Sequence, residues 1–212
     1  MTQPIVYLVD DDEALRQAIE LLFATVDIKV QAFETGEQFL DHFAGGDSPG
    51  CIVLDVCMPG MGGLDVQMVL RARDCPLPIV ILTGHGDAPM AARAIKDGAF
   101  DFIEKPFNNQ TLLDIVRKAI QESDALIQAR LHRDDIHRRL QSLSKREAQV
   151  LQLILAGKSN LEMASELGIS RRTIEVHRAK LMDKMAAGSI AELMRAAFAV
   201  NLIGRPASGR RG

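Results

Sequence analysis

The sequence predicts an α/β fold with a parallel sheet in the first half of the chain and an all-helical fold in the second. Short apolar runs rich in Ile and Val alternate with helical patterns up to about residue 122, and helical patterns alone follow. Residues 1–122 hold 9 Lys and Arg against 19 Asp and Glu, a net charge of −10, whereas residues 123–212 hold 16 against 9, a net charge of +7. This division predicts two modules with different partners, of which only the basic one is suited to nucleic acid.

The composition excludes several classes of protein. No apolar run approaches the ~20 residues that span a bilayer, and the N-terminus lacks the features of a signal peptide, so we expect a cytoplasmic protein without a membrane partner. The three cysteines, Cys51, Cys57 and Cys75, are an odd number without CxxC or Cys/His ligand spacing. This pattern argues against a disulfide framework and against a zinc site.

The acidic half contains the elements of a parallel sheet. Strands are expected at 4–9, 28–33, 51–54, 78–82 and 100–103, and helices at 13–25, 36–44, 63–73, 88–97 and from about 109. Buried strands that alternate with helices indicate a parallel sheet covered on both faces. The segment 28–33 alternates polar and apolar residues more clearly, which suggests a place nearer the edge of the sheet.

Polar residues follow four of these strands. They are Asp10, Asp11, Asp55, Thr83 and Lys105. Because ligands of open α/β sheets bind outside the carboxyl ends of the strands, we expect these residues to converge. Clustered carboxylates suit Mg²⁺, Asp55 could accept a phosphoryl group, and Lys105 could stabilise the charge of that group. Asp12 is expected to cap the first helix instead.

Four motifs in this half, "VDDD", "LDVCMPGMGG", "TGHGDAPMA" and "FIEKPF", resemble the receiver domain of bacterial two-component response regulators. The resemblance implies a doubly wound five-stranded sheet in the flavodoxin-like order 2-1-3-4-5. It implies that a sensor histidine kinase phosphorylates Asp55. It also implies a Mg²⁺ (or Mn²⁺) site formed by Asp10, Asp11, Asp55 and the backbone carbonyl of Cys57.

The same resemblance assigns further roles. Thr83 and Phe102 match the switch pair, and Lys105 matches the phosphate-binding lysine before a cis proline. Phe102 cannot donate a hydrogen bond, so its inward state would depend on packing. Cys57 and His85 occupy positions that tune dephosphorylation in receivers. From the residues alone, Cys57 equally suits a small buried apolar position. His85 could be a general base, but its sequence favours an exposed loop residue.

The basic half predicts a helix-turn-helix. Two short helical patterns meet at "GIS", residues 168–170, and Ser144 with Glu147 forms a capping box before the preceding helix. Arginine can reach phosphates or guanine, and glutamate can accept a hydrogen bond from cytosine. The candidate DNA-binding residues on the second helix are Arg171, Arg172, Thr173, Glu175, Val176 and Arg178.

The motifs "LSKREAQVL", "GKSNLEMASELGIS" and "RTIEVHRAKLMDKM" resemble the LuxR-type four-helix DNA-binding domain. With the receiver in front, the chain resembles regulators of the FixJ/NarL family and is nearest to the FixJ branch. The resemblance implies a receiver at 1–122, a long helical linker at 123–141 and the DNA-binding domain at 142–204. The remaining residues, 205–212, are expected to be disordered.

The sequence of the linker predicts a long helix, because no Gly or Pro occurs from 109 to 156. Apolar residues recur in it at spacings of four and three, which is typical of a coiled-coil seam formed with a second chain. The seam residues within the linker are Leu126, Ala129, Ile136 and Leu140. The alternative is a single amphipathic helix that packs on its own domains.

These features favour a transcriptional regulator that is activated by phosphorylation. The resemblance implies a homodimer when phosphorylated, paired half-sites in promoter DNA and activation through RNA polymerase. The alternative is a Mg²⁺-dependent aspartyl-phosphate phosphohydrolase of the haloacid dehalogenase kind. That class carries its nucleophile after the first strand in a DxDx[TV] pattern, whereas Asp55 follows the third strand, so we expect no enzyme beyond the protein's own phosphoryl transfer and dephosphorylation.

Overall fold

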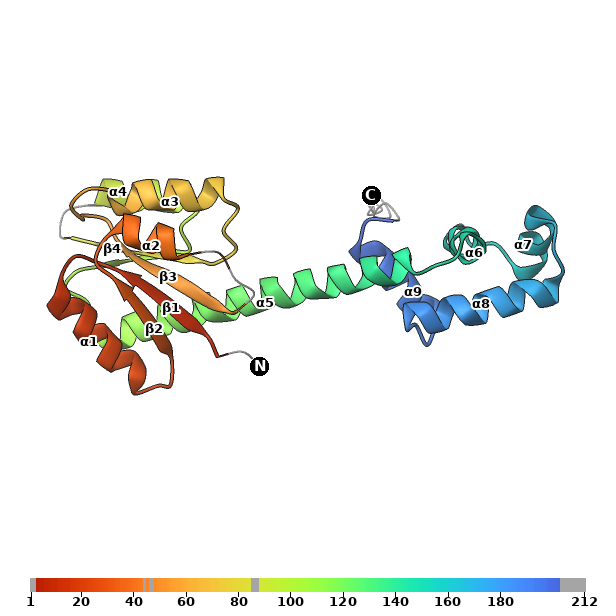
Figure 1. The fold of residues 1–212 in the computed structure, drawn as a ribbon, viewed down its shortest axis with the longest axis horizontal. Helices are drawn as coiled ribbons and strands as arrows, with labels where there is room; N and C mark the ends of the chain where they lie inside the picture. Colours follow the sequence, from red (N-terminus) through yellow and green to blue (C-terminus); the bar gives the residue numbers. More distant parts are fainter. Residues whose placement is uncertain (1–2, 44, 46–47, 85–87, 203–212) are drawn as a thin grey trace, which may run out of the picture. The chain divides into compact units, whose positions relative to one another are not determined.

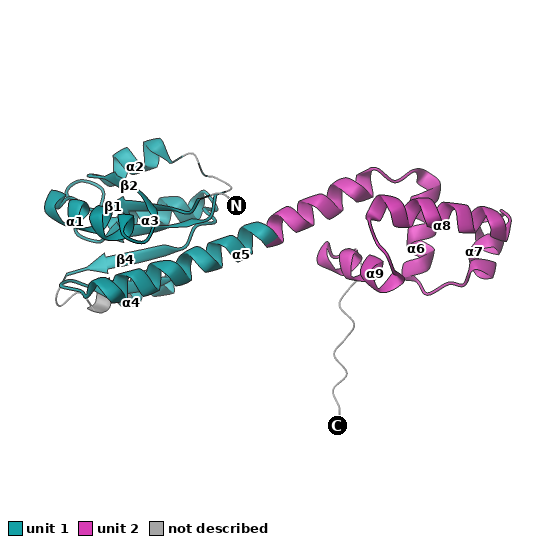
Figure 2. Cartoon of the chain, turned by 90° about the horizontal axis from the view of Figure 1, so that it is seen from below, with its two compact units in different colours: residues 1–128 teal, residues 129–212 magenta. Residues whose placement is uncertain are grey.

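The computed structural model of the chain describes residues 3–43, 45, 48–84 and 88–202, without the side chains of 88, 89 and 91. The chain forms two compact units, residues 1–128 and 129–212 (Figure 2). The division lies inside one helix, α5 (Asn109–Gln141), which therefore contains the whole of the predicted linker. His85 and the predicted tail at 205–212 lie outside the described residues.

The first unit is built on a parallel sheet of five strands in the order β2-β1-β3-β4-β5, as predicted. The strands are β1 (Ile5–Val9), β2 (Lys29–Phe33), β3 (Gly50–Asp55), β4 (Ile79–Thr83) and β5 (Asp101–Glu104). β2 lies at an edge, in agreement with its alternating sequence. All residues of β3 and β4 are buried, which explains their continuous apolar runs.

Helices cover both faces of this sheet (Figure 1). They are α1 (Glu13–Ala24), α2 (Gly36–His42), α3 (Gly63–Ala72), α4 (Ala88–Lys96) and the first turns of α5. Because successive strand residues point to opposite faces, Val6 and Leu8 pack against α1 and α5, whereas Val9 packs in the core beneath α2, α3 and α4. This layering leaves the carboxyl ends of the strands open for a site.

The second unit is helical. It contains the last turns of α5 and α6 (Lys145–Leu155), α7 (Asn160–Leu167), α8 (Arg171–Met185) and α9 (Ile190–Ala199). Gly168 ends α7 in the left-handed conformation, with φ of 66°, and Ser170 then caps α8. The predicted helix-turn-helix and the capping box at Ser144 are both present.

The apolar residues of the predicted seam on α5 have different environments. Ile136 is buried in the core of the second unit and Leu140 packs against it. Leu126 and Ala129 are exposed. Two of the four positions therefore pack in the core of the second unit, as the alternative interpretation expected. The other two remain available to a partner. Among the described residues, no helix has both the length and the apolar composition needed to cross a membrane.

Candidate functional site

Three carboxylates meet where β1 and β3 end. One ligand oxygen each of Asp10, Asp11 and Asp55 lies within 4.8 Å of the others. Asp10 is 0 % exposed and Asp55 is 4 % exposed, whereas Asp11 is exposed to solvent. The structure thus brings together the acidic residues that the sequence places at different strand ends.

Lys105 lies directly against two of these carboxylates. Its Nζ is 2.7 Å from Asp10 Oδ2 and 2.8 Å from Asp55 Oδ1. The following Lys105–Pro106 peptide bond is cis, as expected. Burial alone would lower the pKa of Lys105, but the hydrogen bonds to the two carboxylates outweigh it and the pKa is raised. Burial raises the pKa of Asp55, and Lys105 opposes that rise. A single ammonium group therefore offsets only part of the negative charge.

The backbone around Asp55 is closely packed. A Cβ added to Gly63, at the start of α3, would lie 2.1 Å from the Asp55 carbonyl oxygen, so only glycine allows this approach. On the other side, the Cys57 backbone N–H donates to Asp55 Oδ2 over 3.1 Å. The Cys57 side chain is exposed, so its interpretation as a small buried apolar residue is wrong.

The two residues of the expected switch pair lie on neighbouring strands but differ in exposure. Thr83, at the end of β4, is 2 % exposed and its hydroxyl donates to the Gly84 carbonyl over 3.4 Å. Phe102, on β5, is 42 % exposed. The aromatic ring therefore points outward in this structure, whereas Thr83 ends the strand next to β3, whose last residue is Asp55.

The turn from β1 to α1 is held by side chains. Asp12 accepts hydrogen bonds from the backbone N–H groups of Ala14 and Leu15 at 2.9 and 3.2 Å, which confirms its role as the helix cap. Arg16, which no sequence motif singles out, donates through Nη1 to the Asp10 carbonyl over 2.6 Å. A single arginine in an amphipathic helix gives no sequence signal of such a contact.

The exposed surface of α8 carries most of the candidate DNA-binding residues. An open hollow of about 660 Å³ is bordered by Arg171, Arg172, Glu175 and Val176, together with Ala179, which was not among the predicted residues. Arg171 Nε lies 3.6 Å from Glu175 Oε1. The hollow thus combines guanidinium groups, a carboxylate and two apolar side chains.

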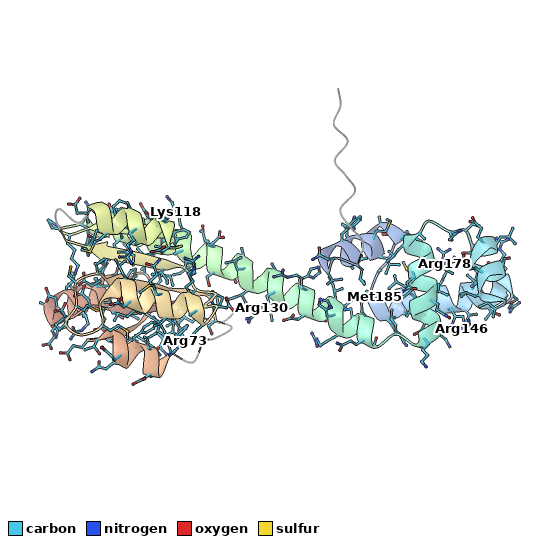
Figure 3. All side chains as sticks on the ribbon, turned by 90° about the horizontal axis from the view of Figure 1, so that it is seen from above. Arg73, Lys118, Arg130, Arg146, Arg178 and Met185 are labelled. Atoms are coloured by element: carbon cyan, nitrogen blue, oxygen red, sulfur yellow. The ribbon has the colours of Figure 1, made fainter. Side chains whose placement is uncertain are left out.

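The other two candidates on α8 make contacts inside the second unit. The Thr173 backbone N–H donates to Ser170 Oγ over 3.1 Å as part of the helix cap. Arg178, labelled in Figure 3, donates through Nη1 to Asn160 Oδ1 at the start of α7. Arg178 therefore joins the two helices of the helix-turn-helix.

The C-terminal end of α8 is fixed to its surroundings. Arg139 Nη1 donates to the Met185 carbonyl over 2.9 Å. Lys184 Nζ donates to the Ser142 carbonyl and lies 2.6 Å from Glu147 Oε2. The hydrogen bond from Lys184, with those from Ser144, lowers the pKa of buried Glu147 to about 2. These contacts, which sequence patterns do not reveal, position α8 on the last turns of α5 and on α6.

Comparison with family models divides the chain in the same way. The model for the response regulator receiver domain matches residues 6–117. The model for bacterial regulatory proteins of the luxR family matches residues 141–197.

Individual proteins are similar over almost the whole chain. Transcriptional regulatory protein FixJ of Bradyrhizobium diazoefficiens is 41 % identical over 95 % of this chain and 98 % of its own length. The C4-dicarboxylate transport transcriptional regulatory protein DctR of Rhodobacter capsulatus is 42 % identical over 90 % and 97 %. The solved structure of the response regulator StyR is 39 % identical and aligns with a TM-score of 0.84, covering 93 % of this chain and 99 % of StyR. Full-length FixJ from B. japonicum aligns at 0.59 with 41 % identity over 96 % and 100 %.

Proposed function

This chain belongs to the FixJ branch of the two-component response regulators, which join a receiver domain to a LuxR-type DNA-binding domain, and we propose that Asp55 is its phosphoacceptor. It is a phosphorylation-activated transcriptional regulator. Its expected donor is a sensor histidine kinase. The observation that supports the role of Asp55 most strongly is its contact with Lys105. Lys105 also contacts Asp10, and all three residues lie at the carboxyl ends of the strands, where ligands of such sheets bind.

The chain's own residues have distinct tasks in the transfer. A carboxylate oxygen of Asp55 attacks the phosphorus of the donor's phosphohistidine, the phosphorus–nitrogen bond breaks, and the imidazole leaves with the electron pair. Lys105, already 2.8 Å from Asp55 Oδ1, then pairs with a phosphoryl oxygen. The Thr83 hydroxyl lies at the carboxyl end of β4 and donates to another phosphoryl oxygen. This hydrogen bond draws the end of β4 toward phosphorylated Asp55.

The donor set fits a hard divalent cation. Three carboxylates share a small volume with one ammonium group, and such all-oxygen ligands select Mg²⁺ or Mn²⁺. Asp11 and Asp55 would hold the ion with the Cys57 backbone carbonyl, and Asp10 would act largely through water. When bound, the ion supplies positive charge next to the transferring oxygens.

The output is carried by the second unit. We propose that Arg171, Arg172, Glu175 and Val176 contact promoter DNA, because they surround the open hollow on the exposed side of α8. Thr173 and Arg178 position this helix. Phosphorylation favours a homodimer that binds paired half-sites and activates transcription through RNA polymerase.

The phosphoacceptor is tested with Asp55→Asn. Wild-type protein incubated with a small radiolabelled phosphodonor and Mg²⁺ is expected to acquire one acid-labile, hydroxylamine-sensitive label, and Asp55→Asn is expected to acquire none. Asp65→Asn on α3 is the control and should be labelled normally. Persistent hydroxylamine-sensitive label in Asp55→Asn would show that another carboxylate is the acceptor.

The alternative of a phosphohydrolase has no support. Its DxDx[TV] nucleophile would follow the first strand, and a luxR-family domain at residues 141–197 would have no role in it.

A further inference from the structure

Arg16 is a cation at the rim of the acidic cluster. It lies in the first turns of α1, is half-buried, and donates through Nη1 to the Asp10 backbone carbonyl over 2.6 Å. Its own backbone N–H donates to the Asp12 carbonyl over 3.0 Å. Arg16 therefore bridges the turn that carries all three N-terminal aspartates.

The contact completes the hydrogen bonding of Asp10. The Asp10 N–H donates to the Phe33 carbonyl, Oδ1 accepts from the Asp12 N–H at 2.9 Å, and Oδ2 accepts from Lys105 at 2.7 Å. The remaining polar group is the carbonyl, and Arg16 holds it. Because that carbonyl belongs to the peptide between Asp10 and Asp11, Arg16 fixes the plane from which the Asp11 carboxylate projects.

This plane matters most for Asp11. Asp10 is buried and held through both carboxylate oxygens, whereas Asp11 is exposed. Among the residues that the structure describes, none donates a hydrogen bond to the Asp11 carboxylate. Its backbone must therefore order it, and loss of that order weakens metal binding.

We propose that Arg16 is a positioning residue of the divalent-cation site, which acts on Asp11 through the Asp10 carbonyl. The inference rests on the proposed function, because it takes the carboxylate cluster to be a metal site. The proposal predicts that removal of Arg16 weakens the binding of a divalent cation, which is the opposite of what charge alone predicts. A guanidinium group near a dication repels it, so its removal would tighten binding if charge alone mattered.

The test is the affinity of the full chain for Mn²⁺, measured from the electron paramagnetic resonance signal of the free ion. Arg16→Met removes the donor and the charge, and we expect a 10–100-fold weaker affinity, the range seen when supporting groups of metal ligands are lost. Arg16→Lys keeps a cationic donor and should recover most of that affinity. Gln17→Met alters an exposed neighbour on α1 and should bind as the wild type does.

Unfolding of the metal-free variants, followed by circular dichroism, separates positioning from stability. A purely structural role would lower the melting temperature and leave the Mn²⁺ affinity of the folded protein unchanged, which would overturn the inference. Unchanged or tighter binding by Arg16→Met would overturn it as well. Arg16→Gln, with a shorter polar side chain, should weaken binding in the same direction and replaces Arg16→Met if that variant does not fold.

The two proposals fail in different ways. If the wild type binds no Mn²⁺, or Asp11→Asn binds as tightly as the wild type, the metal site itself is wrong and the inference falls with it. If the wild type binds Mn²⁺ through Asp11 while Arg16→Met is unaffected, only the role of Arg16 is wrong.

Discussion

Lys105 pairs with two buried carboxylates, and under the proposed function it exchanges one of them for a phosphoryl oxygen when Asp55 is phosphorylated. Lys105→Ala should still accept phosphate from a small donor, because the nucleophile is intact. It should gain little DNA affinity on phosphorylation, because it lacks the ammonium group that we propose to pair with the phosphoryl oxygens. DNA binding with and without phosphodonor tests this, with Lys118→Ala on the exposed side of α5 as the control (Figure 3). A full phosphate response of Lys105→Ala would contradict this role.

Glu147 links the pH of the solution to the stability of the second unit. Its pKa is about 2 in the folded protein against an ordinary value of 4.5, so its stabilising effect is complete above pH 4.5 and is lost as the pH falls toward 2. Glu147→Gln should unfold at a lower temperature than the wild type at pH 7, and the difference should shrink at pH 3. Thermal unfolding of the full chain at both values measures this. Replacement of the exposed Glu166 by Gln is the control, and its effect on the unfolding temperature should not depend on pH in this way.

Single residues also show where sequence reasoning succeeds. Asp10, Asp55 and Lys105 were predictable because the carboxyl ends of parallel strands meet at one edge of a sheet. Arg16 was not, because its partner is a backbone carbonyl whose direction depends on the turn geometry. Glu147 was recognised as part of a capping box, but its partner Lys184 is distant in sequence and comes close only through tertiary packing.

On the helix α8, the residues that we propose to contact DNA differ from the residue that docks the helix on α7. Arg172→Ala should weaken binding to a specific site by ~1–3 kcal/mol if Arg172 reads a base. Arg178→Ala should instead weaken binding to all sequences alike and lower the melting temperature, because Arg178 holds α8 to Asn160. Fluorescence anisotropy with specific and unrelated DNA, together with melting curves, distinguishes the two.

Asn160→Ala is the matched control for Arg178→Ala, since it removes the same contact from α7. The two single variants and the double variant should lose similar stability, as expected for partners in one interaction. Loss of specificity in Arg178→Ala but not in Asn160→Ala would show that Arg178 reads DNA directly.

The helix α5 shows a limit of pattern reasoning. Spacings of four and three predict an apolar stripe but not the surface that covers it. Ile136 and Leu140 pack in the core of the second unit, whereas Leu126 and Ala129 are exposed. One apolar stripe therefore has a buried part and a part that is open to solvent. Helix existence and length were therefore predictable, and the partner of each apolar residue was not.

For the whole molecule, the central question is how the proposed phosphorylation of Asp55 would affect the proposed DNA contacts of α8 in the other unit. A ligand shifts an equilibrium only through different stabilities of two states. We expect α5 to transmit this difference. One Ala inserted after Gln128 turns the following part of the helix by about 100°, and seven inserted residues nearly restore its phase.

The single insertion should uncouple DNA affinity from phosphorylation, and the heptad insertion should largely preserve the response. Both variants are compared with the wild type for DNA affinity with and without phosphodonor. If both respond as the wild type does, α5 acts only as a tether and the signal passes through dimerisation of the receiver.

The surroundings of the cysteines have a practical consequence for such measurements. Cys51 is fully buried and burial raises its pKa to about 12, and burial also raises the pKa of Cys75. Because the thiolate is the form that reacts, alkylating dyes should attach first to the exposed Cys57. This thiol is two residues from Asp55, so a dye on the natural chain could report the proposed phosphorylation and ion binding in real time, without an engineered attachment point.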